Sequence, residues 1–510
     1  MPGLSGPGGV VARSLGRIVT WEHPSVDPNR LDDAPLLRAY RDAERRLGSG
    51  GLRPFTIPGH KYRTDLLGEV VAGDVPLYGG LGTVREADAL VRRAEARAAE
   101  RAGADWCRYS VGGSTHGNQA MALAVGSPGD TVIVDRTSHR SVLLGLVLAG
   151  LRPVWVRPAV HAETGLPLGL EPATVTGALR DHPDARAVFV TSPSYVGTCA
   201  DVTAIAQVTR AAGVPLVVDA AWGAHLGFHA DLPPDPLAAG ADAVVTSAHK
   251  TLPALNQGGV VLARTRLLAP DRLDRAMEAT ATTSPSGAIL ASVDGALALM
   301  AARGAELSGA LLDRVRRART VLREVPGLLV PDRTTFGAGR FDDAKLVLLL
   351  AGTGADGIAV DDDLAAAGFT LEMAHRDLLV PMVTLADDDD AVADLAEMLA
   401  ATIAGRRGQP RPVVPHAAWA VAADQVLTPR EAFFAEHEAV PWESAAGRVC
   451  AEVVAPYPPG VPVLAPGERI TVDALDALGR ARADGARIAY AADPTLASVL
   501  TVRSDVGDGP

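Results

Sequence analysis

Hydrophobic and polar positions follow two alternating patterns between about residues 85 and 265. Short apolar runs occupy residues 131–134, 187–190, 215–218 and 243–246, and the segments between them have apolar residues at helical spacing. Strands that alternate with helices are typical of βαβ units, in which a mostly parallel sheet is covered on both faces. The pattern therefore predicts an α/β fold.

The remaining segments predict the rest of the organisation. Residues 1–30 are Gly-rich without periodicity and predict a loose arm, whereas residues 34–47 have helical spacing. Residues 287–325 predict one long helix or two, residues 345–350 predict a strand, and residues 405–412 have the composition of a linker. We therefore expect four parts, which are an N-terminal arm and helix (1–54), a large domain (55–295), a small α/β domain (296–404) and a C-terminal α+β domain (413–510).

Composition and charge exclude several classes of protein. The 510 residues are 48% hydrophobic and 21% charged, which is typical of a folded globular chain. A net charge of −12 gives no basic surface for nucleic acid or for an anionic membrane. Cys107, Cys199 and Cys450 lack the spacing of a metal site or a disulfide framework, and no signal peptide is evident. We expect a soluble cytoplasmic protein without a structural metal.

Three polar residues follow the ends of predicted strands. Asp219, His139 and Lys250 come directly after or shortly after apolar runs, and ligands of parallel α/β sheets bind outside the carboxyl ends of the strands. A lysine can hold pyridoxal phosphate (PLP) as a Schiff base, and a carboxylate can keep the pyridine nitrogen protonated. The three residues together predict a PLP site.

A glycine turn supplies the phosphate cradle that such a site needs. Gly112, Gly113, Ser114 and Thr115 lead into the helical stretch 118–124, and the free N–H groups of a helix start bind anions. Each signal has an ordinary alternative, namely a surface lysine, a capping aspartate, an exposed loop histidine and a plain turn. Their order along an α/β pattern favours the PLP interpretation.

A series of motifs gives the chain a recognisable resemblance. In order, these are 57–61 (IPGHK), 113–115 (GST), 135–141 (DRTSHRS), 192–197 (SPSYVG), 219–223 (DAAWG), 247–250 (SAHK), 282–285 (TTSP), 456–462 (PYPPGVP) and 466–468 (PGE). Over about residues 55–467 the chain resembles the Orn/Lys/Arg decarboxylase family, in a short form without an N-terminal wing domain. The resemblance implies PLP fold type I, with a mostly parallel sheet of seven strands.

The resemblance also implies a role for each matching residue. Lys250 would carry the Schiff base, Asp219 would pair with the pyridine nitrogen, and His139 would stack on the cofactor ring. The remaining cofactor contacts would come from Gly113, Ser114, Thr115, Ala221, Trp222, Ser247 and His249, of which His249 also suits proton transfer. Thr283 and Ser284 would reach the phosphate of a partner subunit, which implies a homodimer or a dimer of dimers.

The implied reaction is decarboxylation of lysine, arginine or ornithine to the corresponding amine, as in polyamine metabolism. Two alternatives remain open, namely another PLP reaction, such as transamination, elimination or oxidative chemistry, and a catalytically silent regulatory protein. Some positions depart from the family pattern, because Gly113 and Ala281 replace threonines and Ser286 replaces a bulkier residue. Glu443 is a candidate contact for the distal charge of the substrate, although it also suits a plain helix start, and Ser444 follows it where a second acid is common.

Overall fold

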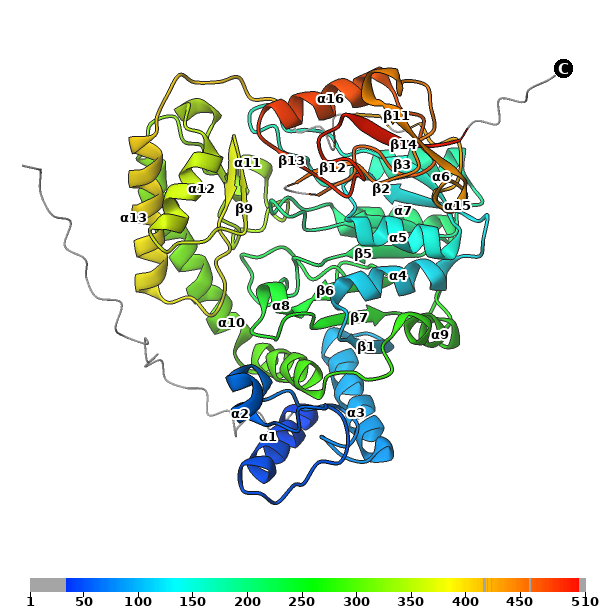
Figure 1. Ribbon diagram of the computed structural model, residues 1–510, viewed down its shortest axis with the longest axis vertical. Helices are drawn as coiled ribbons and strands as arrows, with labels where there is room; N and C mark the ends of the chain where they lie inside the picture. The colour runs from blue at the N-terminus through cyan, green and yellow to red at the C-terminus, as the bar shows by residue number, and fades with distance from the viewer. Residues whose placement is uncertain (1–33, 416–418, 420, 423, 458–459, 504–510) are drawn as a thin grey trace, which may run out of the picture.

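A seven-stranded sheet forms the centre of the part of the chain that the structure describes. The computed structural model describes residues 34–415, 419, 421–422, 424–457 and 460–503, so the predicted arm over residues 1–30 lies outside it. The strand order is β1-β7-β6-β5-β4-β2-β3 (Figure 1). Strands β3, β2, β4, β5 and β6 are parallel, and β7 is antiparallel to its neighbours β6 and β1. The bounds are β1 (Trp106–Ser110), β2 (Thr131–Asp135), β3 (Arg152–Val156), β4 (Val188–Thr191), β5 (Leu216–Asp219), β6 (Ala243–Ser247) and β7 (Gly259–Ala263).

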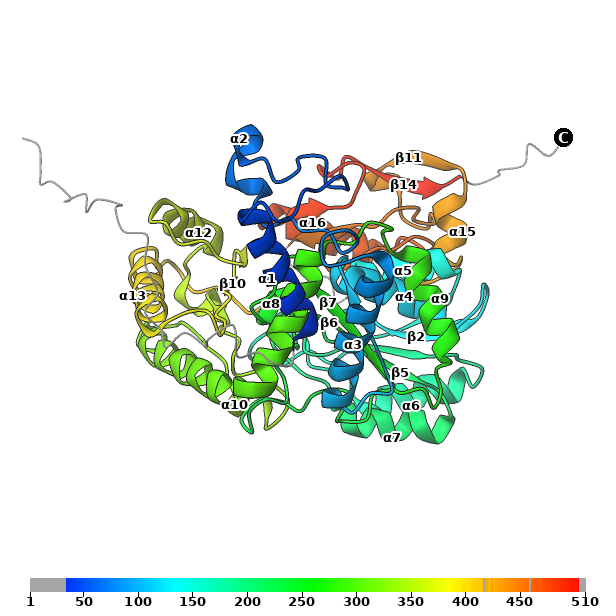
Figure 2. The same ribbon diagram turned by 90° about the horizontal axis from the view of Figure 1, so that it is seen from below.

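Helices cover both faces of this sheet, as the alternating pattern predicts. One face carries α4 (Gly113–Val125), α5 (Arg140–Ala149) and α9 (Pro270–Thr280), and the other carries α6 (Pro172–Asp181) and α7 (Val202–Ala212) (Figure 2). In β5, Val217 packs on the α4 side, whereas Leu216 and Val218 pack on the α7 side. Because side chains alternate along a strand, Asp219 faces α4.

The N-terminal helices pack against the first half of a long helix. α1 (Pro35–Gly48) and α3 (Val84–Ala102) share an apolar cluster with α10 (Gly287–Arg323), and the short helices α2 (Thr64–Leu67) and η2 (Gly68–Val71) connect them. α10 is a single helix, one of the two predicted possibilities. It is long and apolar enough to cross a membrane by length and composition, but 56% of its most apolar window is buried within the protein. Burial of this kind is usual for a core helix of a soluble protein.

A smaller sheet follows α10. Its strand order is β8-β10-β9, and α12 (Gly357–Ala366) and α13 (Asp389–Gly405) pack with it around a separate apolar cluster. The strands are β8 (Leu348–Leu349), β9 (Met373–His375) and β10 (Leu378–Val380), and the short helices α11 (Arg333–Phe336) and η3 (Ala351–Thr353) lie in loops before and after β8. Another short helix, α8 (Ala248–Thr251), directly follows β6 of the central sheet. The strand predicted over residues 345–350 is thus shorter, because the backbone of Lys345 bonds to Asp342 and Arg319 instead of to a neighbouring strand.

The C-terminal segment is α+β and lies beside the β2–β3 edge of the central sheet (Figure 1). Its elements are α15 (Pro429–Phe434), β11 (His437–Pro441), η4 (Trp442–Ser444), β12 (Ala455–Tyr457), α16 (Val472–Ala483), β13 (Arg487–Ala489) and β14 (Ser498–Val502). A buried ion pair joins it to the loop after β2, where Arg136 Nη2 donates to Glu468 Oε2 over 2.9 Å. Pro458 and Pro459 of the predicted turn lie outside the described residues. The predicted domain boundaries remain predictions, and the boundary at residue 295 falls within α10.

Candidate active site

Lys250 and Asp219 lie at the same edge of the central sheet. Asp219 is the last residue of β5, and Lys250 lies in α8, directly after the neighbouring strand β6. Burial lowers the pKa of Lys250, while the charges of Asp219 and Glu372 oppose that shift. Two neighbouring parallel strands thus bring the predicted lysine and carboxylate within electrostatic reach of each other.

Asp219 is buried and held by hydrogen bonds. Its side chain is only 4% exposed, Asn118 Nδ2 donates to Oδ2 over 2.8 Å, and the backbone N–H of Ala221 donates to Oδ1 over 3.1 Å. Burial raises the pKa of Asp219, and the charge of Lys250 and the Asn118 hydrogen bond act in the opposite direction. A fixed carboxylate of this kind is suited to pair with a protonated ring nitrogen.

His139 caps α5 on the same side of the sheet. Its Nδ1 accepts from the backbone N–H of Ser141 over 3.2 Å and lies 2.9 Å from Ser141 Oγ, which in turn accepts from Asn118 Nδ2 over 2.9 Å. Burial and the charges of Lys250 and Arg140 lower the pKa of His139 to about 4. The imidazole is therefore neutral near pH 7, and a hydrogen-bonded chain connects it through Ser141 and Asn118 to Asp219.

The glycine turn and the serine after β6 lie together at the start of α4. Gly113 has φ of +63°, and a Cβ there would lie 3.4 Å from His249 Cε1. Ser247 Oγ donates to Ser114 Oγ over 2.9 Å, and His249 Nδ1 lies 2.8 Å from the carbonyl oxygen of Gly258. Because a carbonyl only accepts, His249 Nδ1 carries the proton. Thr115 is exposed and lies at the same helix start. The structure therefore brings the predicted cradle residues together.

Trp222 forms a wall of the site and contacts two lysines. Lys250 Nζ lies 4.2 Å from the centre of its ring and Lys345 Nζ lies 3.6 Å from it, while Ala221 is buried beside it. Asn118 and Lys345 had no predicted role in the sequence analysis, and neither had Glu372, whose charge acts on both lysines. Asn118 belongs to the predicted helical stretch and lies one turn after the cradle residue Ser114. Residues one turn apart share a helix face, so this spacing could have placed Asn118 at the site.

Thr283, Ser284 and Glu443 are not part of this cluster. All three are exposed, with Thr283 and Ser284 in the segment between α9 and α10 and Glu443 in η4 after β11. The segment 280–286 borders a groove of about 990 Å³ that also reaches Gly112 and Gln257, next to the cradle. Within the described residues, Glu443 makes no side-chain hydrogen bond or ion pair, so its predicted role stays a prediction.

The residues present fit PLP. A helix start with free N–H groups and two serine hydroxyls suits a phosphate dianion, because such groups donate to oxygen without burying a charge of their own. The buried Asn118 side chain fixes the carboxylate of Asp219, and Asn118 Oδ1 has no hydrogen-bond partner among the residues that the structure describes. Among the described residues, no group of three or more His, Cys, Asp or Glu side chains is placed to hold a metal ion.

Known proteins resemble the chain in both sequence and structure. Residues 55–331 match the family model described as Orn/Lys/Arg decarboxylase, major domain, and residues 415–480 match that of its C-terminal domain. An arginine decarboxylase of Bacillus subtilis (strain 168) is 30% identical over 466 residues, which cover 88% of this chain and 94% of the relative. A lysine decarboxylase of Pseudomonas aeruginosa, LdcA, is 25% identical and covers 77% of this chain and 66% of the relative.

Solved structures show the same fold. The Francisella novicida lysine decarboxylase LdcF matches with a TM-score of 0.76 at 19% identity, over 93% of this chain and 82% of its own. A serine palmitoyltransferase of Sphingomonas wittichii matches with a TM-score of 0.52 at 17% identity, over 74% of this chain and 86% of its own. These matches confirm PLP fold type I, and the sequence relatives confirm decarboxylation of a basic amino acid as the reaction, with PLP as the cofactor that the family implies. The chain belongs to the Orn/Lys/Arg decarboxylase family, as the order of its motifs predicts.

Proposed function

We propose that the chain holds PLP covalently on Lys250 and uses it to decarboxylate arginine. The observation that carries this proposal is the position of Lys250 at the same sheet edge as a buried, hydrogen-bonded Asp219, whose charge acts on Lys250. When bound, PLP supplies an acceptor for the electron pair that remains on Cα after the carboxylate departs. In this arrangement Asp219 would pair with the ring nitrogen, and the N–H groups at the start of α4, with Ser114, Thr115 and Ser247, would hold the phosphate.

The residues of the chain prepare the site for this chemistry. Because burial lowers the pKa of Lys250, a larger fraction of its side chain is the free amine, which is the nucleophilic form. His139, a neutral imidazole, would lie against the ring of the bound cofactor. Nδ1 of His249 donates to a backbone carbonyl, and the place of the ring beside Gly113 supports a role at the phosphate end.

Arginine is the substrate that the relatives favour. Four curated relatives named arginine decarboxylase are 29–31% identical to the chain and each covers at least 81% of it, whereas the relatives named lysine decarboxylase are 22–25% identical. An acid must neutralise the distal cation of the substrate, because burial of an unpaired cation is costly. Glu443 and Glu372 are the two candidates, and Glu372 lies close enough to act on both lysines of the site.

A substrate screen tests this proposal. Purified protein is incubated with PLP and with L-arginine, L-lysine or L-ornithine, and both CO2 and the mass of the amine product are measured, with Lys250→Ala as the control. We expect agmatine and CO2 in equal amounts from arginine, and no product from the variant. Sustained consumption of an amino acid without CO2 would favour transamination, elimination or oxidative chemistry, and no turnover of any of the three would favour a silent regulatory protein.

We also propose a cytoplasmic homodimer, or a dimer of dimers, in which Thr283 and Ser284 reach the phosphate cradle of the partner subunit. Two observations support it, namely the exposure of both residues and the groove of about 990 Å³ that runs from their segment to Gly112. A second copy of the chain seated in that groove would place each segment near the other's cradle. The acidic net charge of −12 is consistent with a protein that binds neither nucleic acid nor a membrane surface.

A further inference from the structure

Lysine is rare in this chain, and two of the three lysines lie against the same side chain. The sequence has 45 arginines but only Lys61, Lys250 and Lys345. Lys250 and Lys345 both place Nζ over the Trp222 ring, at 4.2 and 3.6 Å from its centre. Arginine serves almost every other cationic position, so the lysine at 345 is not explained by a general need for positive charge.

The fold makes a specific place for Lys345. Its side chain is 6% exposed and packs on Gly197, which has φ of +87° and where a Cβ would lie 2.9 Å from Lys345 Cγ. Its backbone N–H donates to Asp342, and its carbonyl oxygen accepts from Arg319 Nη2 over 2.6 Å. A residue with a Cβ at 197 would therefore require the Lys345 side chain or the backbone at 197 to shift.

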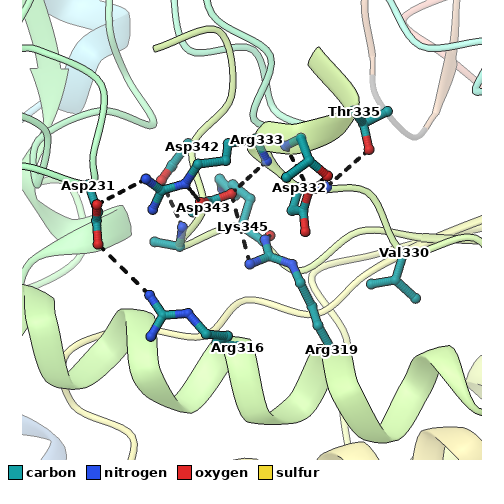
Figure 3. A network of polar contacts seen from close by, with 12 residues as sticks. Asp231, Arg316, Arg319, Val330, Asp332, Arg333, Thr335, Asp342, Asp343 and Lys345 are labelled. Atoms are coloured by element: carbon teal, nitrogen blue, oxygen red, sulfur yellow. Dashed lines mark hydrogen bonds and ion pairs between the residues drawn. The ribbon is translucent and has the colours of Figure 1, made fainter. Parts of the chain in front are cut away.

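A network of charged residues fixes the loop that carries Lys345. Asp343 accepts from the backbone N–H of Arg333 over 2.9 Å and lies 4.0 Å from Arg319, and Asp231 accepts from Arg333 over 3.0 Å (Figure 3). Figure 3 shows these side chains converging beside Lys345 from α10, α11 and the loop that contains Asp231. The carboxylates of this network bind arginines. The network therefore holds the backbone of Lys345 but does not neutralise its side chain.

The ammonium group of Lys345 lacks an ion-pair partner among the described residues. Asp342, three residues before Lys345, is fully buried, and its carboxylate lies 3.1 Å from His225 Nε2. Burial, the largest cause, and the charge of Lys250 together lower the pKa of Lys345 to about 8, although the charges of Asp342 and Glu372 oppose the shift. A buried cation of this kind is destabilising unless an anion pairs with it. The site would therefore be stabilised by an anion that binds beside Lys345.

We propose that Lys345 binds the α-carboxylate of the substrate, the group that leaves as CO2. This inference rests on the proposed function. The α-amine of the amino acid takes the place of Lys250 Nζ, and the carboxylate is attached to the same Cα, so it must enter within a few bond lengths of that nitrogen. The cation that shares the Trp222 ring with Lys250 is the one in position to receive it.

Such an ion pair would orient the bond that breaks, but it exists only while the carboxylate is bound. Because the interaction is strongest before CO2 leaves, loss of Lys345 weakens substrate binding more than it slows the chemical step. The amine product has no carboxylate, so its affinity is independent of Lys345. These two consequences separate a carboxylate receptor from a lysine that only supports the fold.

Two ligands that cannot be decarboxylated at this site test the proposal. 5-Guanidinopentanoate has the carboxylate of arginine without its α-amine, and agmatine has the amine without the carboxylate. Each is titrated by calorimetry into PLP-loaded wild type, Lys345→Met and Lys345→Gln, together with the corresponding lysine pair, 6-aminohexanoate and cadaverine. Retention of the folded state is checked by thermal unfolding of each variant.

We expect both variants to bind the carboxylate ligand about tenfold or more weakly and the amine within about twofold of wild type. The affinity of wild type for the carboxylate ligands should fall as the pH rises above about 8, where Lys345 loses its proton. In the variants this pH dependence should be absent. Equal weakening of both ligands, or unchanged carboxylate binding, would overturn the proposal. So would a wild type that binds the amines but neither carboxylate, whereas an amino acid consumed without CO2 would count against the proposed function alone.

Discussion

Asn118 and Asp219 are 101 residues apart in the sequence, and the amide of the first donates to the carboxylate of the second over 2.8 Å. The same amide nitrogen donates to Ser141 Oγ over 2.9 Å, so one side chain on α4 supports both Asp219 and the loop of His139. Asn118 therefore acts through Asp219 as a positioning residue.

Replacement of Asn118 by leucine should raise the pKa of Asp219, because the hydrogen bond that favours its charged form is lost. A hydrogen bond to a charged group is worth about 1.5–3 kcal/mol, so we expect kcat to fall by about tenfold or more. The acid limb of the kcat/KM profile should move to higher pH. Gln119→Leu, on the next position of the same helix, is the control, and an unmoved acid limb in Asn118→Leu would contradict the assignment.

The buried pair of Arg136 and Glu468 should contribute strongly to stability. Both side chains are at most 2% exposed, and Arg136 also lies over the Trp155 ring at 4.9 Å. Glu468→Leu leaves a buried unpaired guanidinium, so we expect the free energy of unfolding to fall by about 3–5 kcal/mol in urea titrations. The double variant Arg136→Met/Glu468→Leu should recover part of that loss, and Glu443→Leu, which removes an exposed acid, should change stability little.

Asp294 should give the protein a measurable pH dependence of stability. It is 1% exposed and accepts from the backbone N–H of Leu36 over 2.8 Å, which ties α10 to the start of α1. Burial raises its pKa from 3.8 to about 6, so the folded state binds more protons than the unfolded state between these values. Its contribution to stability is therefore largest below pH 3.8 and decreases as the pH rises through about 6.

Asp294→Asn keeps an acceptor without this titration. Its stability relative to wild type should rise between pH 4 and pH 7 in chemical denaturation, because only the wild type must bury a charge there. Asp294→Ala should be about 1–2 kcal/mol less stable than Asp294→Asn at every pH, since neither variant titrates at this position and only the alanine variant lacks the acceptor at the start of α1. Parallel stability curves for wild type and Asp294→Asn would show that Asp294 does not titrate in this range.

Shared active sites predict complementation between subunits. Lys250→Ala removes the lysine, and the double variant Thr283→Ala/Ser284→Ala removes the proposed phosphate contacts from the partner, so each protein alone should have little activity. When the two are unfolded, mixed in equal amounts and refolded, half of the dimers are mixed and each mixed dimer has one complete site. About a quarter of wild-type activity should return. If each site is built from a single chain, the mixture will be as inactive as its components.

The strand pattern predicted the residues that depend on local sequence. Asp219 and Lys250 follow apolar runs that became β5 and β6, and parallel strands necessarily bring their ends to one edge. The glycine turn before residue 118 was likewise predicted, because a helix start after glycines is a local feature.

Lys345 and Glu372 could not be placed in this way. Their positions depend on contacts with Gly197, Arg319 and the smaller sheet, which are distant in the sequence, and residue 345 was expected to begin a strand. The count of only three lysines was a signal that could have singled out Lys345. For Glu372, no pattern in its own segment distinguishes it from the other acids.

The pairing of Arg136 with Glu468 also bears on how the protein is made. The two residues are 332 positions apart, and Arg136 lies three residues before His139 in the loop after β2. During synthesis this loop emerges early, but the carboxylate that pairs with its arginine is absent until residue 468 has left the ribosome. The cofactor side of the central sheet therefore reaches its final form only near the end of translation, and a nascent chain stopped at the 405–412 linker would carry an unfinished site.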